Sequence, residues 1–208
     1  MSDDEDEVLS GTERVARALI GDTYRQDTYH KALGEFIAKF AVVESIMQMA
    51  LRHFAGVQTP IAESLFSGTR AKAAADYIKR IGQAQKWSKD RQKEWKYVVD
   101  QFSHLQSLRN DVVHYGAVWR GSDVWIASNQ LYAHTKENIT NLPASPEVLK
   151  AATADLGKIA RHVVAFTWPE RLVGAPPKYQ ASLKRAWRYK PPPQAGRPQK
   201  TRGKSQER

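Results

Sequence analysis

The 208-residue chain contains no cysteine, which excludes disulfide bonds, iron–sulfur clusters and thiolate zinc sites. No apolar run approaches the length that crosses a bilayer. The acidic first residues, Met1–Glu7, do not have the pattern of a signal peptide. We therefore expect a soluble cytoplasmic protein with no membrane association. The length suits one domain with tails, large enough to bury a hydrophobic core.

Several chemical signatures are missing as well. The sequence has no glycine-rich phosphate loop of the P-loop or dinucleotide type, and no His-x-x-x-His or His-x-Glu zinc pattern. No pair of nearby carboxylates is placed to hold magnesium, and no serine lies in a nucleophile elbow. We expect neither a metal site nor a cofactor, so any chemistry must come from ordinary side chains.

Positive charge, in contrast, is abundant and unevenly placed. The net charge is +10, yet residues 1–13 carry six acids and no base. Residues 174–208 carry ten Lys or Arg and one acid, which leaves about +7 for residues 14–173. A basic body with a basic tail favours a polyanionic partner, most simply nucleic acid. The alternative is that the charge serves solubility and that the tail is merely solvated.

Apolar residues recur at helical spacing in four long segments, residues 28–54, 69–82, 88–116 and 146–166. Helix-start signals precede the first and last of them, at Asp27-Thr28 and Ser145-Pro146. Glycines are predicted to end the two central helices, Gly82 the second and Gly116 the third. A further short helix is expected over residues 12–20. The fold class is therefore mainly α, a helical bundle.

After Gly116 the periodicity changes from helical to alternating. Residues 117–120 and 123–128 are predicted to form a β-hairpin around Gly121-Ser122, with a third short strand at residues 131–134. The predicted organisation is an acidic disordered leader (1–11), a helical domain (12–173) with a small β-hairpin insertion at about 117–134, and a basic, Pro-rich disordered tail (174–208).

The helix before Gly116 carries an arginine on its apolar side. Arg109 falls in the same sector as Phe102, Leu105 and Val112, where a guanidinium needs a partner. Glu44, at the edge of the apolar stripe of residues 28–54, is a candidate ion-pair partner. The alternative is that Glu44 reaches solvent or pairs with a surface cation such as Arg52.

Arg109 and His114 are five residues apart, roughly 140° around an ideal helix. They converge only if the last turn bends or if a second copy of the helix supplies the missing half. A cation, an amide and an imidazole at a helix end suit phosphodiester cleavage without a metal, because histidine moves the proton and arginine holds the phosphate charge.

The order Arg109-Asn110-Asp111-x-x-His114 resembles the R-x4-6-H signature of the HEPN superfamily (higher eukaryote and prokaryote nucleotide-binding domains). Many members are metal-independent ribonucleases of toxin and defence systems. The resemblance covers residues 28–168 and implies a HEPN-like helical bundle that forms a homodimer with two motifs facing each other. It also implies endoribonucleolytic cleavage, in which the RNA 2′-OH attacks the adjacent phosphate and leaves a 2′,3′-cyclic phosphate.

In this interpretation the catalytic residues are Arg109, Asn110 and His114. His114 is the general base or acid, Arg109 stabilises the charged phosphorane, and Asn110 orients the histidine or the phosphate. Glu44 and Asp111 are supporting residues, although a solvent-facing position is the simpler expectation for Asp111. Because HEPN domains also occur as non-catalytic modules, the alternative function is a nucleic-acid- or nucleotide-binding or protein-interaction dimer.

The expected partners are RNA, a second copy of the chain, and an antitoxin or other protein that binds the basic tail. Two tryptophans, Trp87 and Trp95, lie among the cations and suit base stacking. The alternative is a solvated helical face with Trp95 in the core. The residues predicted to bind nucleic acid are Arg70, Lys72, Lys79, Arg80, Lys86 and Lys89.

Overall fold

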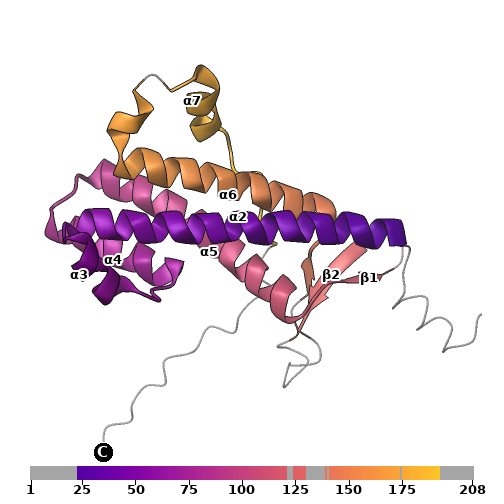
Figure 1. Cartoon of the computed structure of the whole chain (residues 1–208). Helices are drawn as coiled ribbons and strands as arrows, with labels where there is room; N and C mark the ends of the chain where they lie inside the picture. The colour runs from indigo at the N-terminus through magenta and orange to yellow at the C-terminus, as the bar shows by residue number, and fades with distance from the viewer. Residues whose placement is uncertain (1–22, 121–123, 130–138, 140, 174, 193–208) are drawn as a thin grey trace, which may run out of the picture.

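The computed structural model describes residues 23–120, 124–129, 139, 141–173 and 175–192 (Figure 1). The acidic leader, the short helix expected at 12–20 and the strand expected at 131–134 lie outside these residues. The described part is mainly α, with six α-helices and a small antiparallel sheet, which confirms the predicted class. No helix in it combines the length and apolar character needed to span a membrane.

The longest helix, α2 (Thr23–Ala55), crosses the molecule and organises the bundle (Figure 1). It packs against α6 (Pro146–Thr167), α4 (Ala71–Ala84) and the short α3 (Thr59–Phe66). Its buried stripe includes Phe36, Phe40, Val43 and Met47, as the apolar spacing predicts.

Helix α2 begins earlier than the sequence predicts, because it already includes Thr23 and continues through the expected cap at Asp27-Thr28. A tertiary contact holds the helix close to the expected cap. Tyr29 is buried, and its ring stacks on Trp125 of the sheet with centroids 4.2 Å apart and planes within 5°. Packing of this kind overrides a local cap signal, since helix stability in proteins comes mostly from the buried face.

Helix α5 (Lys89–His114) matches the prediction closely. Ser88 caps its start by accepting a hydrogen bond from the Arg91 backbone N–H at 3.3 Å. Gly116 follows its end with φ of 66°, in the left-handed region that favours glycine. The buried positions of α5 face α4 and α6, and they are Trp95, Val98, Gln101, Phe102, Leu105, Leu108 and Val112.

The small β-sheet follows α5 directly in the chain. Strands β1 (Val118–Arg120) and β2 (Val124–Ser128) form the predicted antiparallel hairpin, with Trp119 opposite Trp125. A third strand, β3 (Asn141–Pro143), pairs with the other edge of β2, so the sheet extends past the predicted insertion limit at residue 134. Three residues are too few to define an alternation, and proline is uncommon in strands away from sheet edges, so the sequence did not predict this strand.

The prediction that Gly82 ends the helix of residues 69–82 is wrong, because α4 continues to Ala84. Lys86 takes the left-handed conformation instead, with φ of 54°. The backbone N–H groups of Lys86 and Trp87 then donate to the carbonyls of Gln83 and Gly82, at 3.1 and 2.9 Å. This pattern is a Schellman motif, which satisfies the last carbonyls of the helix.

Gly82 instead provides space for a tryptophan. A Cβ at this position would lie 2.4 Å from Cε3 of Trp87, whose ring packs between Phe54 and Phe166. We expect Gly82→Ala to lower the free energy of unfolding by about 1–3 kcal/mol, the usual cost of overpacking a core. Equilibrium urea denaturation measures this change.

Gly34→Ala is the matched control. Gly34 is an exposed position inside α2, and a Cβ there meets nothing within 4 Å. The same substitution should raise stability by about 0.5–1 kcal/mol, because alanine has the higher helix propensity. Equal effects at the two positions would contradict the packing role of Gly82.

The C-terminal part of the described chain folds back on α6. It contains η2 (Pro169–Leu172), α7 (Pro177–Lys184) and an extended segment that ends at the buried Tyr189. The assignment of all of 174–208 to a disordered tail is therefore wrong for residues 177–189. The physical reason is Asp155 of α6, a fully buried carboxylate that accepts hydrogen bonds from the backbone N–H groups of Arg188 and Tyr189.

Candidate functional site

The motif occupies the last two turns of α5, on the side of the bundle where α5 approaches α2. Arg109 is half-buried there, with its Cζ 5.9 Å from the centre of the Phe40 ring. Its Nη1 donates a hydrogen bond to Oδ1 of the neighbouring Asn110, at 3.2 Å. A cation over an aromatic face is electrostatically favourable. The arginine is thus held in place by a ring and an amide.

The structure does not contain the predicted ion pair with Glu44. Among the described residues, no ion pair joins Glu44 to Arg109, although Glu44 lies one turn after Phe40 and is half-buried. Arg52, the alternative partner of Glu44, pairs with Glu63 at 3.5 Å. Phe40 and Asn110 provide the contacts that the guanidinium was expected to take from a carboxylate. Its charge is therefore not neutralised by an acid of the described chain.

Asp111 and His114 are three residues apart on α5 and interact electrostatically. Asp111 is half-buried, and burial raises the pKa of its carboxyl, while the charge of His114 partly offsets the rise. Burial, together with the charge of Asp111, raises the pKa of Tyr189 to about 12. The expectation that Asp111 faces solvent is wrong in part, because the residue is half-buried and its charge acts on Tyr189 of the C-terminal segment.

His114 is the final residue of α5, and its side chain is exposed. Helix α5 stays α-helical up to this residue, so no bend brings His114 round to Arg109. Five residues on a regular helix place the two side chains on different sides. The first of the two ways in which Arg109 and His114 were expected to converge, a bend in the last turn, is therefore absent.

The six cations predicted to bind nucleic acid are all exposed. Trp87 and Trp95, in contrast, are 8% and 3% exposed, so they belong to the core and are not base-stacking platforms. The Trp95 indole N–H donates to the carbonyl of Ala75 at 3.2 Å, which fixes α5 to α4. Lys89 lies twenty residues before Arg109 on one straight helix, about 30 Å away. The cations around Lys89 therefore do not border the motif.

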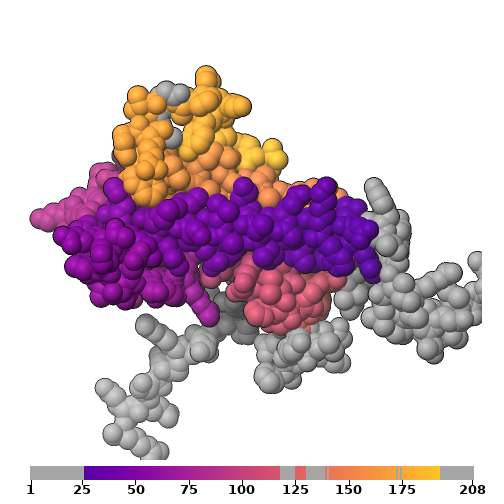
Figure 2. Space-filling model, viewed as in Figure 1, coloured from indigo at the N-terminus to yellow at the C-terminus, as the bar shows by residue number. Residues whose placement is uncertain are grey.

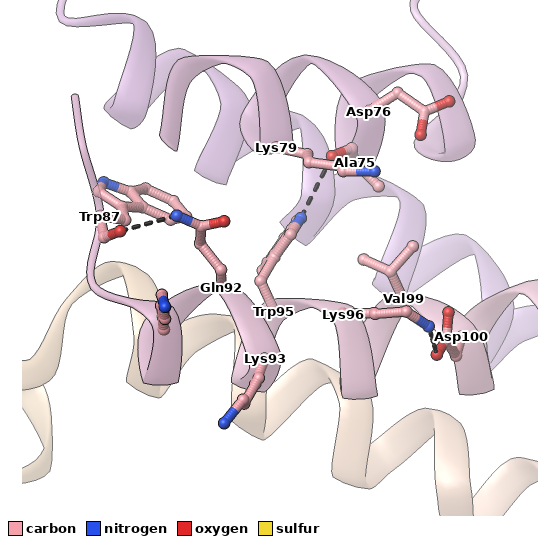
Figure 3. Close-up of a pocket in the computed structure, with 11 residues that line it drawn as sticks. Ala75, Asp76, Lys79, Trp87, Gln92, Lys93, Trp95, Lys96, Val99 and Asp100 are labelled. Atoms are coloured by element: carbon pink, nitrogen blue, oxygen red, sulfur yellow. Dashed lines mark hydrogen bonds and ion pairs between the residues drawn. The ribbon is translucent and has the colours of Figure 1, made fainter. Parts of the chain in front are cut away.

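A second feature, which the sequence did not reveal, lies where these cations gather. An open groove of about 500 Å³ lies between helices α4 and α5 (Figure 3). It is lined by residues 75–79 of α4, by Trp87, and by residues between 89 and 100 of α5. Helical periodicity indicated which residues are apolar or charged, but a groove depends on how closely two helices approach.

The side chains that could ligate a metal ion are not clustered in the described residues. Within the described ranges, no three histidine, aspartate or glutamate side chains cluster closely enough to hold one. Comparison of the chain with protein-family models, curated proteins and solved structures finds no match. The function is therefore argued from the geometry of the site.

Proposed function

We propose that the end of α5 is half of a metal-independent endoribonuclease site of HEPN type, completed by a second copy of the chain. The observation that carries this proposal is that Arg109 is held in a fixed orientation without an acidic partner in the described chain. Its guanidinium is oriented by Phe40 and Asn110, yet no carboxylate of the described chain neutralises it. A fixed and unneutralised guanidinium at a half-exposed position suits the binding of a phosphate.

The chemistry follows from the groups present. His114 of one copy takes the proton of the RNA 2′-OH, and the 2′-oxygen then attacks the adjacent phosphorus. Arg109 of the other copy stabilises the charge that develops on the phosphorane oxygens. The bond to the 5′-oxygen breaks, that oxygen takes a proton from solvent, and a 2′,3′-cyclic phosphate remains. Asp111 orients the imidazole, and Asn110 holds the arginine.

Exposed apolar side chains support contact with a second copy. Val113, within the motif, is 46% exposed. Val42 and Met49 on α2 are 45% and 48% exposed, and their spacing of seven residues puts them on one face of that helix. Figure 2 shows that α2 has a side that the other described elements leave uncovered. Burying apolar positions of this kind in a twofold interface is favourable.

The test is an RNA cleavage assay in EDTA with the full-length chain. We expect labelled single-stranded RNA to be cut without divalent metal and to carry 2′,3′-cyclic phosphate ends, identified by mass spectrometry. The matched substrate has the same sequence with 2′-deoxy nucleotides, and it should resist cleavage because it lacks the attacking hydroxyl. Cleavage of the deoxy substrate, or cleavage that needs added magnesium, would contradict the mechanism.

An enzyme of this kind suits a toxin or defence effector controlled by an antitoxin or another protein. RNA binding without cleavage in the same assay would instead favour the non-catalytic binding dimer. The two outcomes are distinguished in one experiment, because bound and cleaved RNA separate on native and denaturing gels.

A further inference from the structure

Residues 177–190 form a basic strap that docks on α6. Figure 1 shows α7, the first part of this strap, beside α6. The strap contains no acid and five cations, which are Lys178, Lys184, Arg185, Arg188 and Lys190. Docking brings these charges toward two further cations on α6, Lys158 and Arg161. Because like charges repel, the strap must be held by specific contacts.

Lys158 lies at the centre of these contacts, with only 1% of its surface exposed. Its Nζ donates hydrogen bonds to the backbone carbonyl of Arg185 and, at 3.5 Å, to the hydroxyl of Tyr97 on α5. It also lies 4.0 Å from the centre of the Trp187 ring. A carbonyl, a hydroxyl and a ring hold the ammonium group without cancelling its charge. A positive charge is therefore buried beneath the strap.

His162 lies one turn after Lys158 on α6 and also holds the strap. Its Nε2 is 3.1 Å from the backbone carbonyl oxygen of Leu183, to which it donates because a carbonyl only accepts. The ring faces Tyr97 and Trp187, with centroids 6.3 and 6.0 Å away. Its Nδ1 is buried and, among the described residues, has no hydrogen-bond partner. In the docked strap the neutral ring thus makes its one hydrogen bond through Nε2.

A second proton on this ring is unfavourable while the strap is docked. The new Nδ1–H would be a buried donor without an acceptor in the described chain. The new charge would also lie beside Lys158 and Arg161 on the same helix. Asp155, the acid of this cluster, is already paired with Arg185 of the strap at 3.3 Å. Burial, and after it the charge of Lys158, lower the pKa of His162, and its carbonyl bond only partly opposes them.

We propose that His162 is a pH-sensitive latch, which holds the strap on α6 while its imidazole is neutral and releases the strap when the imidazole takes a proton. The sign follows from linkage, because the docked state binds this proton less well than the released state. Docking is therefore complete above the ordinary histidine pKa of about 6.5 and weakens as the pH falls below it. Release separates the five cations of the strap from α6. This inference does not depend on the ribonuclease proposal.

The test is hydrogen–deuterium exchange of the full-length protein at about pH 8 and about pH 5.5, both above the usual range of carboxylates. Rates are corrected for the intrinsic effect of pH on amide exchange. The amides of Arg188 and Tyr189 report on docking, because both donate to Asp155. Their protection should fall at least about 5-fold at the lower pH, the low end of the cost of an unsatisfied buried donor. Peptides from residues 36–47 of α2 should keep their protection. Equal strap protection at the two pH values, or a parallel loss in α2, would overturn the latch.

His162→Gln tests which group titrates. Glutamine keeps an N–H donor for the Leu183 carbonyl but takes no proton, so strap protection in this variant should be the same at both pH values. His104→Gln is the matched control, since His104 is an exposed histidine of α5, and it should keep the wild-type response. An undiminished response in His162→Gln, or its disappearance in His104→Gln, would exclude His162 as the latch.

The wild-type protein provides a second measurement, in case the substitution itself loosens the strap. The imidazole Cε1–H signal of His162, assigned by its absence in His162→Gln, is followed by NMR over the same pH range. Its titration should coincide with the loss of strap protection. A ring that takes its proton while the strap stays protected would overturn the proposal, whatever the variant does.

Discussion

His114→Ala should lower the rate of RNA cleavage in EDTA by about 10²–10⁴-fold, the usual contribution of a general acid–base group. Histidine is the residue type that most often transfers the proton in such reactions. Because His114 is exposed, its removal leaves the core untouched, and the thermal unfolding temperature should not change. Initial cleavage rates and thermal melts of the same preparations measure both quantities.

His104→Ala is the matched control, since His104 is also exposed and lies ten residues earlier on α5. It should cleave RNA like the wild type. A full rate in His114→Ala, or an equal loss in His104→Ala, would exclude the proposed role of His114.

Mixing two inactive variants tests whether the site is shared between copies. In a twofold dimer of His114→Ala with Arg109→Ala, one of the two sites keeps both residues. Random exchange should therefore restore about a quarter of the wild-type activity, because half of the dimers are mixed and each has one intact site. No recovery after verified subunit exchange would contradict a site built from Arg109 of one copy and His114 of the other.

The sequence predicted those parts of the fold that local patterns determine. Ser88 and Gly116 delimit α5 because a capping hydroxyl and a left-handed glycine act within one turn of the helix. The hairpin at 117–128 was equally predictable, since alternation and a short turn define it. The fold class, mainly α, and the position of the motif at a helix end were predictable from these signals alone.

The features that the sequence did not predict depend on contacts between distant residues. Gly82 was expected to end a helix, but a glycine is required there because the ring of Trp87 occupies the space of a Cβ. Arg109 was expected to form an ion pair, but its side chain contacts Phe40 and Asn110. An aromatic face and an amide can also contact a guanidinium, and helical spacing does not distinguish these partners from a carboxylate.

The strongest structural prediction concerns Asp155, a fully buried acid of α6. Its carboxylate is fully buried and accepts hydrogen bonds from the backbone N–H groups of Arg188 and Tyr189, the nearest at 2.8 Å. It also accepts from Gln101 Nε2 at 3.2 Å and from Arg185 Nη2 at 3.3 Å. Asp155→Ala should lower the free energy of unfolding by about 3–5 kcal/mol, because these donors and the Arg185 charge lose their partner together.

Urea denaturation measures the loss, and limited proteolysis locates it, since cleavage should appear first in residues 175–190 once their anchor is removed. Asp155→Asn keeps one acceptor oxygen and should lose less stability than Asp155→Ala. Asp100→Ala is the control, because Asp100 is an exposed acid paired with Lys96, and such pairs contribute only about 0–1 kcal/mol. If Asp155→Ala and Asp100→Ala were equally stable, the carboxylate would not be what holds the basic C-terminal segment on the bundle.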